Sequence, residues 1–559
     1  MCCNNVHDNS RICYLYCTAT LTTSSVCEML RQGVCVSRSL VVGGQNAALR
    51  NVSARVLKRC NSTMVATQAR PEEWDYAKPF EDMPGPKPLP IIGNTWRFIP
   101  HIGDLYRLTE ESYHRDLYEM YGKIMKITGI PGVKNMVMVF DPDVIEKVYR
   151  NEGPWPIRDT ATSLAYYRLI TRKDFFQGVG GVAITQGEIW QKFRSKVNPT
   201  MMQPRSTKLY VAPIDSVAND FLKRIRLIRD ENLEMPDDFA NELCKWGLES
   251  IVYIALDTRL GCLDADLAPD SEPQKMIDCV SVVFDCLHVM ESKIPMWKYV
   301  STPTWRKFLK ASDMMTEFCM KHINQAMERL KAMPEDPDRE LTVLEKLLIT
   351  DPDPKTAIVM ALDMMGAGVD TTSYSTAVAV YYLAQNPEKQ QKLFQEILRY
   401  LPDKDQPVTS EILTELKYLK ACIKESMRLS PLFVANQRET VKDMVLADYQ
   451  IPKGTSIFMP FTMLGHMEQY CPEANKFIPE RWLKTEQEHS KRAHPFVTMP
   501  FGFGPRMCVG RRFADLEMET LVAKIIRNFK VEYNYDMKFG NKLLHVPVSP
   551  LKFKMSERV

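Results

Sequence analysis

The sequence predicts a mainly α-helical protein with a minor β portion. Helical patterns run over long stretches, above all over residues 355–385, whereas the patterns typical of strands are short. Proline and glycine separate these elements, but no low-complexity linker and no internal repeat occurs between residues 80 and 559. We therefore expect one α-rich domain, although a length of 559 residues would by itself suggest three or four.

The composition narrows the class of protein. The chain has 72 basic and 69 acidic residues, which gives a net charge of +3 and argues against a nucleic-acid partner. Seven of the 15 cysteines lie in the first 60 residues, and the other eight show no CxxC spacing. This pattern predicts neither a disulfide framework nor a zinc site, so a reducing compartment fits best.

The N-terminal segment has the composition of a targeting sequence. Residues 1–70 contain eight Lys/Arg and only two acids, Asp8 and Glu28, and they include no run of about 18 apolar residues that could span a membrane. An Arg-rich, Ser-rich and acid-poor leader is typical of a mitochondrial transit peptide, and an ordinary tail is the alternative. We predict a transit peptide over about residues 1–65, and a main domain over residues 66–559.

The main domain begins with a proline-rich entry segment. Residues 83–94 hold four prolines within seven positions, which forbids a helix and favours a stiff extended path. Residues 124–130 and 135–140 have the character of two short strands around Pro131 and Gly132, a hairpin pattern. A helix is expected to start at Asp141 and to run to residue 150.

Helices dominate from about Glu188 onward. The longest pattern covers residues 355–385, and a second covers residues 387–401, with Pro387 in its first turn. A third covers residues 409–429 and ends before a proline. Short strands are expected near residues 444–449 and 456–458, and close to the C-terminus.

A glycine-shaped loop around Cys508 points most directly to chemistry. The run from Phe501 to Gly510 has the pattern Phe-x-x-Gly-x-Arg-x-Cys-x-Gly, and a helical pattern follows from Arg511 through Ile526. A thiol at a helix N-terminus meets unpaired N–H groups and the positive end of the macrodipole. We expect these to lower the pKa of the thiol and to favour a thiolate that ligates iron. An inert buried cysteine is the alternative for any single cysteine.

This loop resembles the haem-ligand loop of the cytochrome P-450 superfamily. The resemblance covers roughly residues 80–559 and implies a single-domain cytochrome P-450 fold around a buried haem b (iron protoporphyrin IX), with Cys508 as axial iron ligand. It also implies a monooxygenase that inserts one oxygen atom from O2 into a lipophilic small molecule. The residues that it assigns to haem binding are Trp190, Arg194, Arg438, Phe501, Arg506, Cys508 and Gly510.

A second motif lies in the middle of the long helix. Two glycines there weaken the helix, and the Thr371 hydroxyl can bond the carbonyl of Ala367 four residues back, which bends a helix and leaves room for a small ligand. Close packing is the alternative for such residues. The pattern Ala-Gly-x-Asp-Thr-Thr resembles the family's oxygen-activation motif, which implies that Asp370 and Thr371 deliver protons through water.

Two further patterns resemble family motifs. Glu425 and Arg428 are spaced to pair on one helical face, and the segment around Arg481 resembles the third member of the family's buried triad. We expect this triad to serve the fold and haem incorporation, since a half-broken buried charge network costs several kcal/mol. Trp190 and Arg194, four residues apart, resemble the pair that binds haem propionates; Arg506 and Arg438 are the other expected propionate partners.

Four basic residues, expected near the thiolate, indicate which branch of the superfamily the chain resembles. The residues Lys420, Lys424, Arg511 and Arg512 resemble the ferredoxin-docking site of the mitochondrial clan, and the chain as a whole resembles insect family twelve. A solvated charged face is the alternative. The resemblance implies electrons from NADPH through ferredoxin reductase and an acidic 2Fe–2S ferredoxin. It implies a location on the matrix side of the mitochondrial inner membrane, with peripheral membrane association.

The substrate is not readable from the sequence. Segments apolar enough to line a pocket are residues 159–179, 282–296, 364–367, 432–437 and 544–548. Steroid hydroxylation and clearance of lipophilic xenobiotics both remain open. Two other classes are a haem-thiolate isomerase, dehydratase or sensor without O2 activation, and a protein without haem in which Cys508 is structural. The presence of Asp370 and Thr371 favours the monooxygenase.

Overall fold

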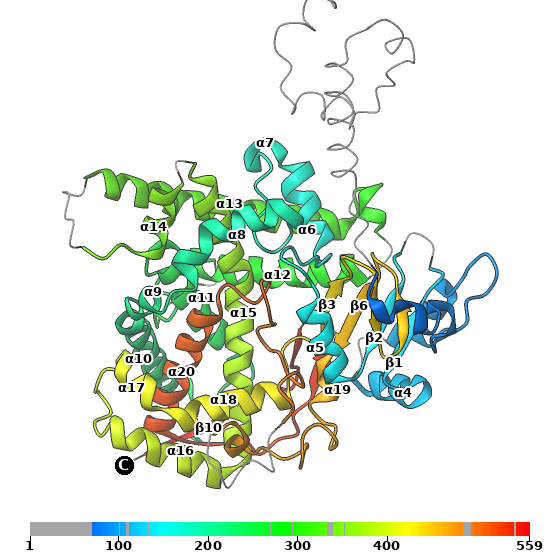
Figure 1. Ribbon diagram of the computed structural model, residues 1–559. Coiled ribbons are helices and arrows are strands. Elements are labelled where there is room, and N and C mark those ends of the chain that lie inside the picture. Colours follow the sequence, from blue (N-terminus) through cyan, green and yellow to red (C-terminus); the bar gives the residue numbers. More distant parts are fainter. Residues whose placement is uncertain are drawn as a thin grey trace, which may run out of the picture. The chain divides into compact units, whose positions relative to one another are not determined.

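A long central helix, α15 (Lys355–Gln385), organises the fold (Figure 1). The computed structural model describes residues 70–558, except residues 100, 108–110, 131–132, 266, 269, 293–294, 333–338, 352, 484–492 and 542–543. Residues 72–559 form one compact unit. Most of α15 is buried, because α11 (Phe239–Leu256), α13 (Pro303–Ala332), α18 (Lys417–Leu429) and α20 (Arg511–Asn528) pack around it. The predicted mainly α-helical class is confirmed.

The remaining helices surround this centre. They are α4 (Glu111–Tyr121), α5 (Pro142–Arg150), α6 (Thr162–Tyr166), α7 (Lys173–Phe176), α8 (Gly187–Met201), α9 (Pro204–Lys208), α10 (Val211–Ile228), α12 (Glu272–Ser292), α14 (Val343–Thr350), α16 (Pro387–Tyr400), α17 (Ser410–Glu415) and α19 (Phe461–Leu464). A π-helical turn, Tyr167–Thr171, joins α6 to α7. Asp141 caps α5 as expected, by accepting hydrogen bonds from two backbone N–H groups of its first turn.

Two of the three long helical predictions are confirmed, and the third is wrong in one respect. The predicted helix over residues 409–429 is two helices, α17 and α18, which Leu416 separates with ψ of 69°. A carboxylate from another helix explains the break. Glu396 of α16 accepts hydrogen bonds from the N–H groups of Tyr418 and Leu419 at 2.8 and 3.0 Å, and so caps α18 from outside the segment.

A four-stranded sheet lies beside the helices, in the order β1-β2-β6-β3 (Figure 1). The antiparallel pair β1 (Ile124–Ile127) and β2 (Met136–Val139) confirms the predicted hairpin. β2 pairs in parallel with β6 (Ser456–Pro460), and β6 pairs antiparallel with β3 (Ala435–Glu439), a strand that was not predicted. Apolar clusters fill the space under this sheet and around α15.

Three two-stranded antiparallel sheets, β4-β5, β8-β9 and β7-β10, complete the described β structure. The segment predicted as one strand over residues 444–449 is instead a hairpin of β4 (Met444–Leu446) and β5 (Tyr449–Ile451). Ala447 and Asp448 form its turn at φ of 46° and 66°, and this turn chemistry was missed. The C-terminal strands are β7 (Phe529–Glu532), β8 (Phe539–Asn541), β9 (His545–Pro547) and β10 (Lys554–Glu557).

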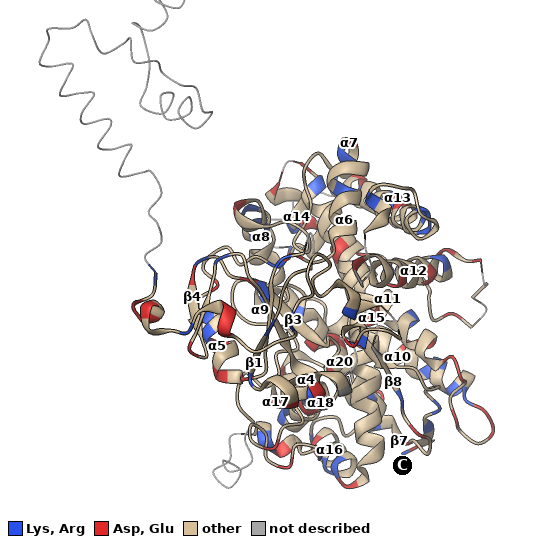
Figure 2. Cartoon of the chain, turned by 90° about the vertical axis from the view of Figure 1, so that its right-hand side faces the viewer, with Lys and Arg blue, Asp and Glu red and all other residues tan. Residues whose placement is uncertain are grey.

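Basic and acidic residues are mixed over the described chain. Lys/Arg and Asp/Glu are interspersed along the helices (Figure 2). Among the residues that the structure describes, no helix combines the length and the apolar character that crossing a membrane requires. The predicted leader over residues 1–65 lies outside the described residues.

Candidate active site

The cysteine loop has the predicted form and leads directly into α20. The N–H of Cys508 donates to the carbonyl of Phe501 at 2.8 Å, which closes the loop. Gly504 has φ of +76°, and a Cβ there would lie 2.2 Å from a carboxylate oxygen of Glu152, so only glycine fits. Gly510 is the N-cap residue of α20. The thiol therefore stands at the N-terminus of a buried helix.

The pKa of this thiol differs from the expectation. Burial raises the pKa of Cys508, while a hydrogen bond from the Gly510 N–H and the charges of Arg194 and Arg158 lower it. The predicted net lowering is wrong for the protein alone, because the protein atoms near the sulfur limit the hydration of a thiolate even though one side of the residue stays exposed. The Cys508 side chain nevertheless remains open to a small molecule on one side.

The motif in α15 leaves room beside the helix. The hydroxyl of Thr371 donates to the carbonyl of Ala367 at 2.6 Å, as expected. Ala367 is exposed, although its neighbours Met365 and Val369 on the same helix are buried. The helix continues through this region without a break. A small ligand could therefore lie next to Ala367 and Thr371.

Asp370 contacts a thiol of the neighbouring helix α11. Its Oδ1 accepts a hydrogen bond from the thiol of Cys244 on α11 at 3.7 Å. Burial raises its pKa to about 6, and the nearby carboxylate of Asp285 on α12 acts in the same direction. A carboxyl group with such a pKa exchanges protons close to neutral pH, as a general acid requires.

Four arginines gather near the cysteine loop: Arg194, Arg438 and Arg506 are buried, and Arg158 is partly buried. Burial lowers the pKa of Arg194 to about 10 and of Arg506 to about 9, and both also feel the charge of Arg158. Burial likewise lowers the pKa of Arg158, which the sequence analysis did not single out. Arg438 forms an ion pair with Glu152 at 2.5 Å. One carboxylate cannot neutralise four guanidinium groups, so this region carries excess positive charge.

Two of these arginines have unused donors. The Nε atoms of Arg158 and Arg194 are buried and have no hydrogen-bond partner among the described residues. Arg506 is satisfied by backbone carbonyls, including that of Thr185 at 2.8 Å, and its guanidinium lies 4.9 Å from the ring of Trp190. A buried, cationic and incompletely bonded cluster beside an accessible thiol fits haem b, whose two propionates supply anionic acceptors.

The triad forms a fully buried network. Glu425 accepts hydrogen bonds from Arg428 at 2.8 and 2.9 Å and from Arg481 at 2.9 Å, and all three side chains are wholly buried. Trp482 and the N–H of Ile478 donate to the same carboxylate at 2.8 and 3.0 Å. The two arginines also bond the carbonyls of the segment around residues 472–476. The network therefore fixes α18 against the chain that precedes the cysteine loop.

The first predicted pocket segment is held by carboxylates from three helices. Glu291 of α12 accepts hydrogen bonds from Ser163 and Thr162 at the start of α6, at 2.7–2.9 Å. Asp313 of α13 binds Arg172 at 2.5 Å. Asp363 of α15 binds Arg168 and the N–H of Val182. We call residues 161–182, with these three carboxylate partners, the tethered segment.

The four basic residues predicted for docking lie close together. Lys424 is exposed, and its ammonium stands 4.0 Å from the ring of Trp482. Partial desolvation by the surrounding protein lowers the pKa of Lys424, and the charge of Arg511 lowers it further. Lys420 lies 3.8 Å from Glu519. Arg512 donates to the carbonyl of Met202 and thus turns toward α8.

Acidic residues of α20 moderate this basic patch, which consists of Lys420, Lys424, Arg511 and Arg512. Arg511 pairs with Asp515 at 3.4 Å, within its own helix. Burial raises the pKa of both Asp515 and Glu519, to about 8 for Glu519. A carboxyl group with that pKa is mostly neutral at pH 7, so the patch keeps a positive excess.

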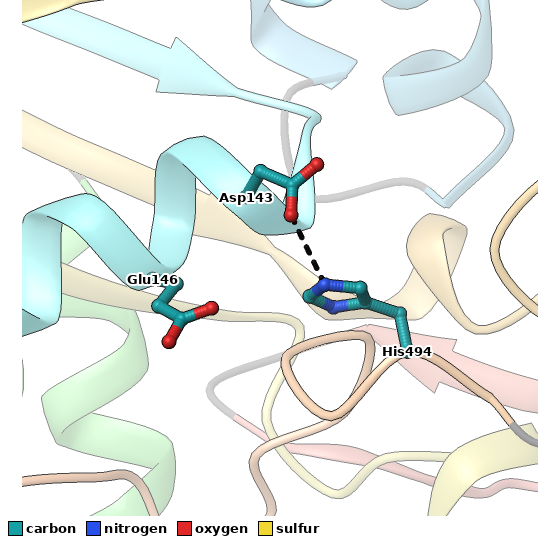
Figure 3. A group of neighbouring side chains, drawn as sticks. All are labelled: Asp143, Glu146 and His494. Carbon is teal, nitrogen blue, oxygen red and sulfur yellow. Dashed lines mark hydrogen bonds and ion pairs between the residues drawn. The ribbon is translucent and has the colours of Figure 1, made fainter.

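A further cluster has the composition of a cation site but is hydrogen-bonded instead (Figure 3). Asp143 and Glu146 lie on successive turns of α5 and approach the ring of His494. The Nδ1 of His494 accepts the N–H of Phe496 at 3.1 Å, and its Nε2 lies 3.2 Å from a carboxylate oxygen of Asp143. These contacts link α5 to the segment before the cysteine loop.

The comparisons with known proteins agree with this geometry. The family profile described as Cytochrome P450 matches residues 83–555. The chain is 40% identical to "Probable cytochrome P450 301a1, mitochondrial" of Drosophila melanogaster, over 96% of this chain and 98% of that protein. It is 39% identical to "Cytochrome P450 CYP12A2" of Musca domestica, over 89% and 95%, and 39% identical to "Probable cytochrome P450 12a5, mitochondrial" of Drosophila melanogaster, over 87% and 92%.

Proposed function

Because this chain belongs to the cytochrome P450 family of haem-containing monooxygenases, we propose that it inserts one oxygen atom from O2 into a lipophilic small molecule, a steroid or a xenobiotic. The observation that carries this proposal is the combination of an accessible thiol at Cys508 with an acid–threonine pair, Asp370 and Thr371, in the central helix. A haem-thiolate isomerase, dehydratase or sensor would not need that pair.

The protein's own residues would hold the cofactor as follows. Cys508 would ligate the iron through its thiolate, with Phe501 and Gly510 shaping the loop beside it. Trp190, Arg158, Arg194, Arg438 and Arg506 would bind the propionates, and these would add anionic partners to the one carboxylate, Glu152, that now pairs with Arg438. When bound, haem supplies the redox centre for O2 reduction and for oxygen insertion.

Asp370 and Thr371 would handle the protons of this reaction. The pKa of about 6 lets Asp370 take up a proton from solvent and release it at neutral pH. The Thr371 hydroxyl, which now donates to Ala367, can turn to donate into the space beside the helix. Together they would supply protons to the reacting oxygen while apolar neighbours exclude bulk water.

We propose an electron path from NADPH through ferredoxin reductase and an acidic 2Fe–2S ferredoxin, docked on the basic patch. The positive excess of that patch supports this path, because opposite charges steer the encounter of two proteins. Several relatives are named as mitochondrial, which supports a mitochondrial location for this chain. More specifically, we propose that residues 1–65 direct import into mitochondria. The protein would then associate peripherally with the matrix side of the inner membrane.

The function is tested by a spectrum followed by turnover. The dithionite-reduced, CO-bound holoenzyme should show the red-shifted Soret band of a haem-thiolate. Turnover of a panel of steroids and lipophilic xenobiotics should then depend on NADPH, O2, ferredoxin reductase and ferredoxin. A normal spectrum with rearranged or dehydrated products, and no O2 consumption, would favour the isomerase or dehydratase. Faster turnover with a two-flavin NADPH reductase would overturn the ferredoxin proposal.

Localisation has its own test. Residues 1–65 fused to a fluorescent protein should direct it to mitochondria, with cleavage of the leader. A matched fusion in which the six arginines of residues 1–65 (Arg11, Arg31, Arg38, Arg50, Arg55 and Arg59) are changed to glutamine should stay in the cytosol. A reticular pattern of the unchanged leader would overturn the mitochondrial proposal.

A further inference from the structure

Helices α11 and α15 pack against each other next to the acid–threonine pair (Figure 1), and glycines allow their close approach. A Cβ on Gly247 of α11 would lie 2.5 Å from the Ser373 hydroxyl, and one on Gly368 of α15 would lie 2.8 Å from Ile251. The hydroxyl of Ser373 also donates to the carbonyl of Leu243 at 2.9 Å. Since the glycines set the distance and the serine sets the register, α11 presents a fixed face to α15.

This fixed face of α11 brings a thiol within hydrogen-bonding distance of the Asp370 carboxyl group. Cys244 follows Leu243 directly, is buried, and donates from Sγ to Oδ1 of Asp370 at 3.7 Å. The other ionisable groups that interact with Asp370 are Asp285 from α12 and Tyr374 one turn further along α15. Among the described residues, Asp285 and Tyr374 act on this carboxyl only through their charge, whereas Cys244 donates a hydrogen bond to it.

We propose that Cys244 is a positioning residue for Asp370: its thiol holds the carboxyl group in one orientation against α11 and favours its charged form between proton deliveries. This inference rests on the proton-delivery role of Asp370 proposed above. A thiol suits such a task because it is a weak donor without charge. The carboxyl can leave it during turnover, whereas an arginine or lysine partner would hold the carboxylate far more strongly.

The proposal predicts how each of three substitutions changes the pH dependence of the reaction. Cys244→Ala removes a hydrogen bond that favours the charged carboxyl, so Asp370 should keep its proton to higher pH. The pH above which less product forms per NADPH should therefore move upward by roughly half to one unit. Cys244→Ser keeps a donor and should leave that pH at or below the wild-type value. Cys262→Ala, which removes another buried thiol in the segment that follows α11, should change nothing.

A double-mutant comparison separates positioning from packing. In an Asp370→Asn background, Cys244→Ala should have no further effect on the coupling profile, because its target no longer titrates. An equal loss in both backgrounds would mean that Cys244 only fills space, and would overturn the proposal. If Asp370→Asn alone couples like wild type, the proposed relay itself falls and the positioning role falls with it.

The contact also has a readout that is independent of turnover. The infrared S–H stretch of Cys244, identified by its loss in Cys244→Ala, should lie at a hydrogen-bonded frequency in wild type. It should move to the frequency of a free thiol in Asp370→Ala, and stay unchanged in Asp174→Ala on the exposed helix α7. An S–H band that Asp370→Ala leaves unmoved would overturn the proposal even if the relay role of Asp370 stands.

Discussion

Arg168 and Asp363 form an ion pair with an N–O distance of 2.6 Å, and each side chain is only 5% exposed. The pair joins the π-helical turn of the tethered segment to α15, one turn before Ala367. The same carboxylate accepts the N–H of Val182 at 3.0 Å. One buried acid of the central helix thus fixes the π-helical turn and the C-terminal end of the tethered segment, most of which was predicted to line the substrate pocket.

Removal of this acid should destabilise the protein strongly. Asp363→Asn leaves the Arg168 guanidinium buried without its counter-charge, and we expect the free energy of unfolding to fall by about 3–5 kcal/mol. Urea denaturation of the holoenzyme measures this change in the free energy of unfolding. The exposed pair of Glu188 and Lys192 is the control, because Glu188→Gln should cost at most about 1 kcal/mol. Equal losses in both variants would contradict the role of the buried pair.

The iron ligand is tested by spectroscopy. Cys508→His should abolish the red-shifted Soret band of the reduced CO complex and with it monooxygenation, because imidazole cannot donate electron density as a thiolate does. Cys262→Ala should keep both. If Cys508→His retains the thiolate spectrum, another residue ligates the iron.

Thr371→Ala should uncouple the reaction while haem and substrate still bind. Without the hydroxyl, electrons are diverted to peroxide, and we expect about a tenfold or larger fall in product formed per NADPH. Peroxide and product are quantified together against NADPH consumption. Thr376→Ala is the matched control, since Thr376 makes the same type of bond to the carbonyl four residues back, at 2.8 Å, but is fully buried. Wild-type coupling in Thr371→Ala would remove Thr371 from the proton path.

The raised pKa of Asp370 predicts how stability changes with pH. The folded-state pKa is about 6, above the ordinary value of 3.8, so the folded protein binds this proton more tightly than the unfolded chain. The resulting stabilisation is complete below about pH 3.8 and is lost as the pH rises through about 6. Asparagine does not titrate and suffers no such loss.

Asp370→Asn should therefore gain stability relative to wild type as the pH rises from about 4 to about 7, by roughly 3 kcal/mol at most. Denaturant titrations at a series of pH values measure the difference between the two proteins. Asp174→Asn, on the exposed surface of α7, should show a constant difference over the same range. A constant difference for Asp370→Asn as well would mean that its pKa is not raised.

Charge reversal on the basic patch should weaken ferredoxin binding. Lys420→Glu with Lys424→Glu should raise the apparent KM for ferredoxin by the equivalent of about 1–3 kcal/mol at low salt. The effect should shrink above ~0.15 M salt because of screening. Steady-state turnover at several salt concentrations measures it, while the CO spectrum and peroxide-driven turnover should stay normal.

The matched control is Lys321→Glu with Lys331→Glu, which reverses two exposed charges on α13. It should leave the KM for ferredoxin unchanged. Equal effects of the two double variants would indicate a general response to net charge and would remove the docking site.

Local patterns predicted those parts of the fold that local forces determine. The bounds of α15, the cap of α5 by Asp141 and the bond from Thr371 to Ala367 all depend on residues a few positions apart. The break at Leu416 was missed because its cause, Glu396, lies on another helix and meets α18 only after folding.

The same distinction holds for the candidate site. The motif residues of the cysteine loop and of α15 were found from spacing, and their catalytic roles remain predictions. Arg158 was missed because its signal is burial beside other arginines, which a single sequence does not display. The rise in the pKa of Cys508 was missed for a similar reason, since the helix N-terminus is visible in the sequence but the loss of water around the sulfur is not.

The parallel pairing of β2 with β6 has a consequence for the order in which this chain can fold. Val137 lies opposite Ile457, so the strand next to the first hairpin comes from near the other end of the described chain. During synthesis or import, β1 and β2 appear early and keep one edge unpaired until most of the polypeptide has followed. Such long-range pairing slows folding and leaves an aggregation-prone edge open in the meantime. We expect chaperone dependence to end only after β6 is released, so a truncation before residue 456 should remain bound to chaperones.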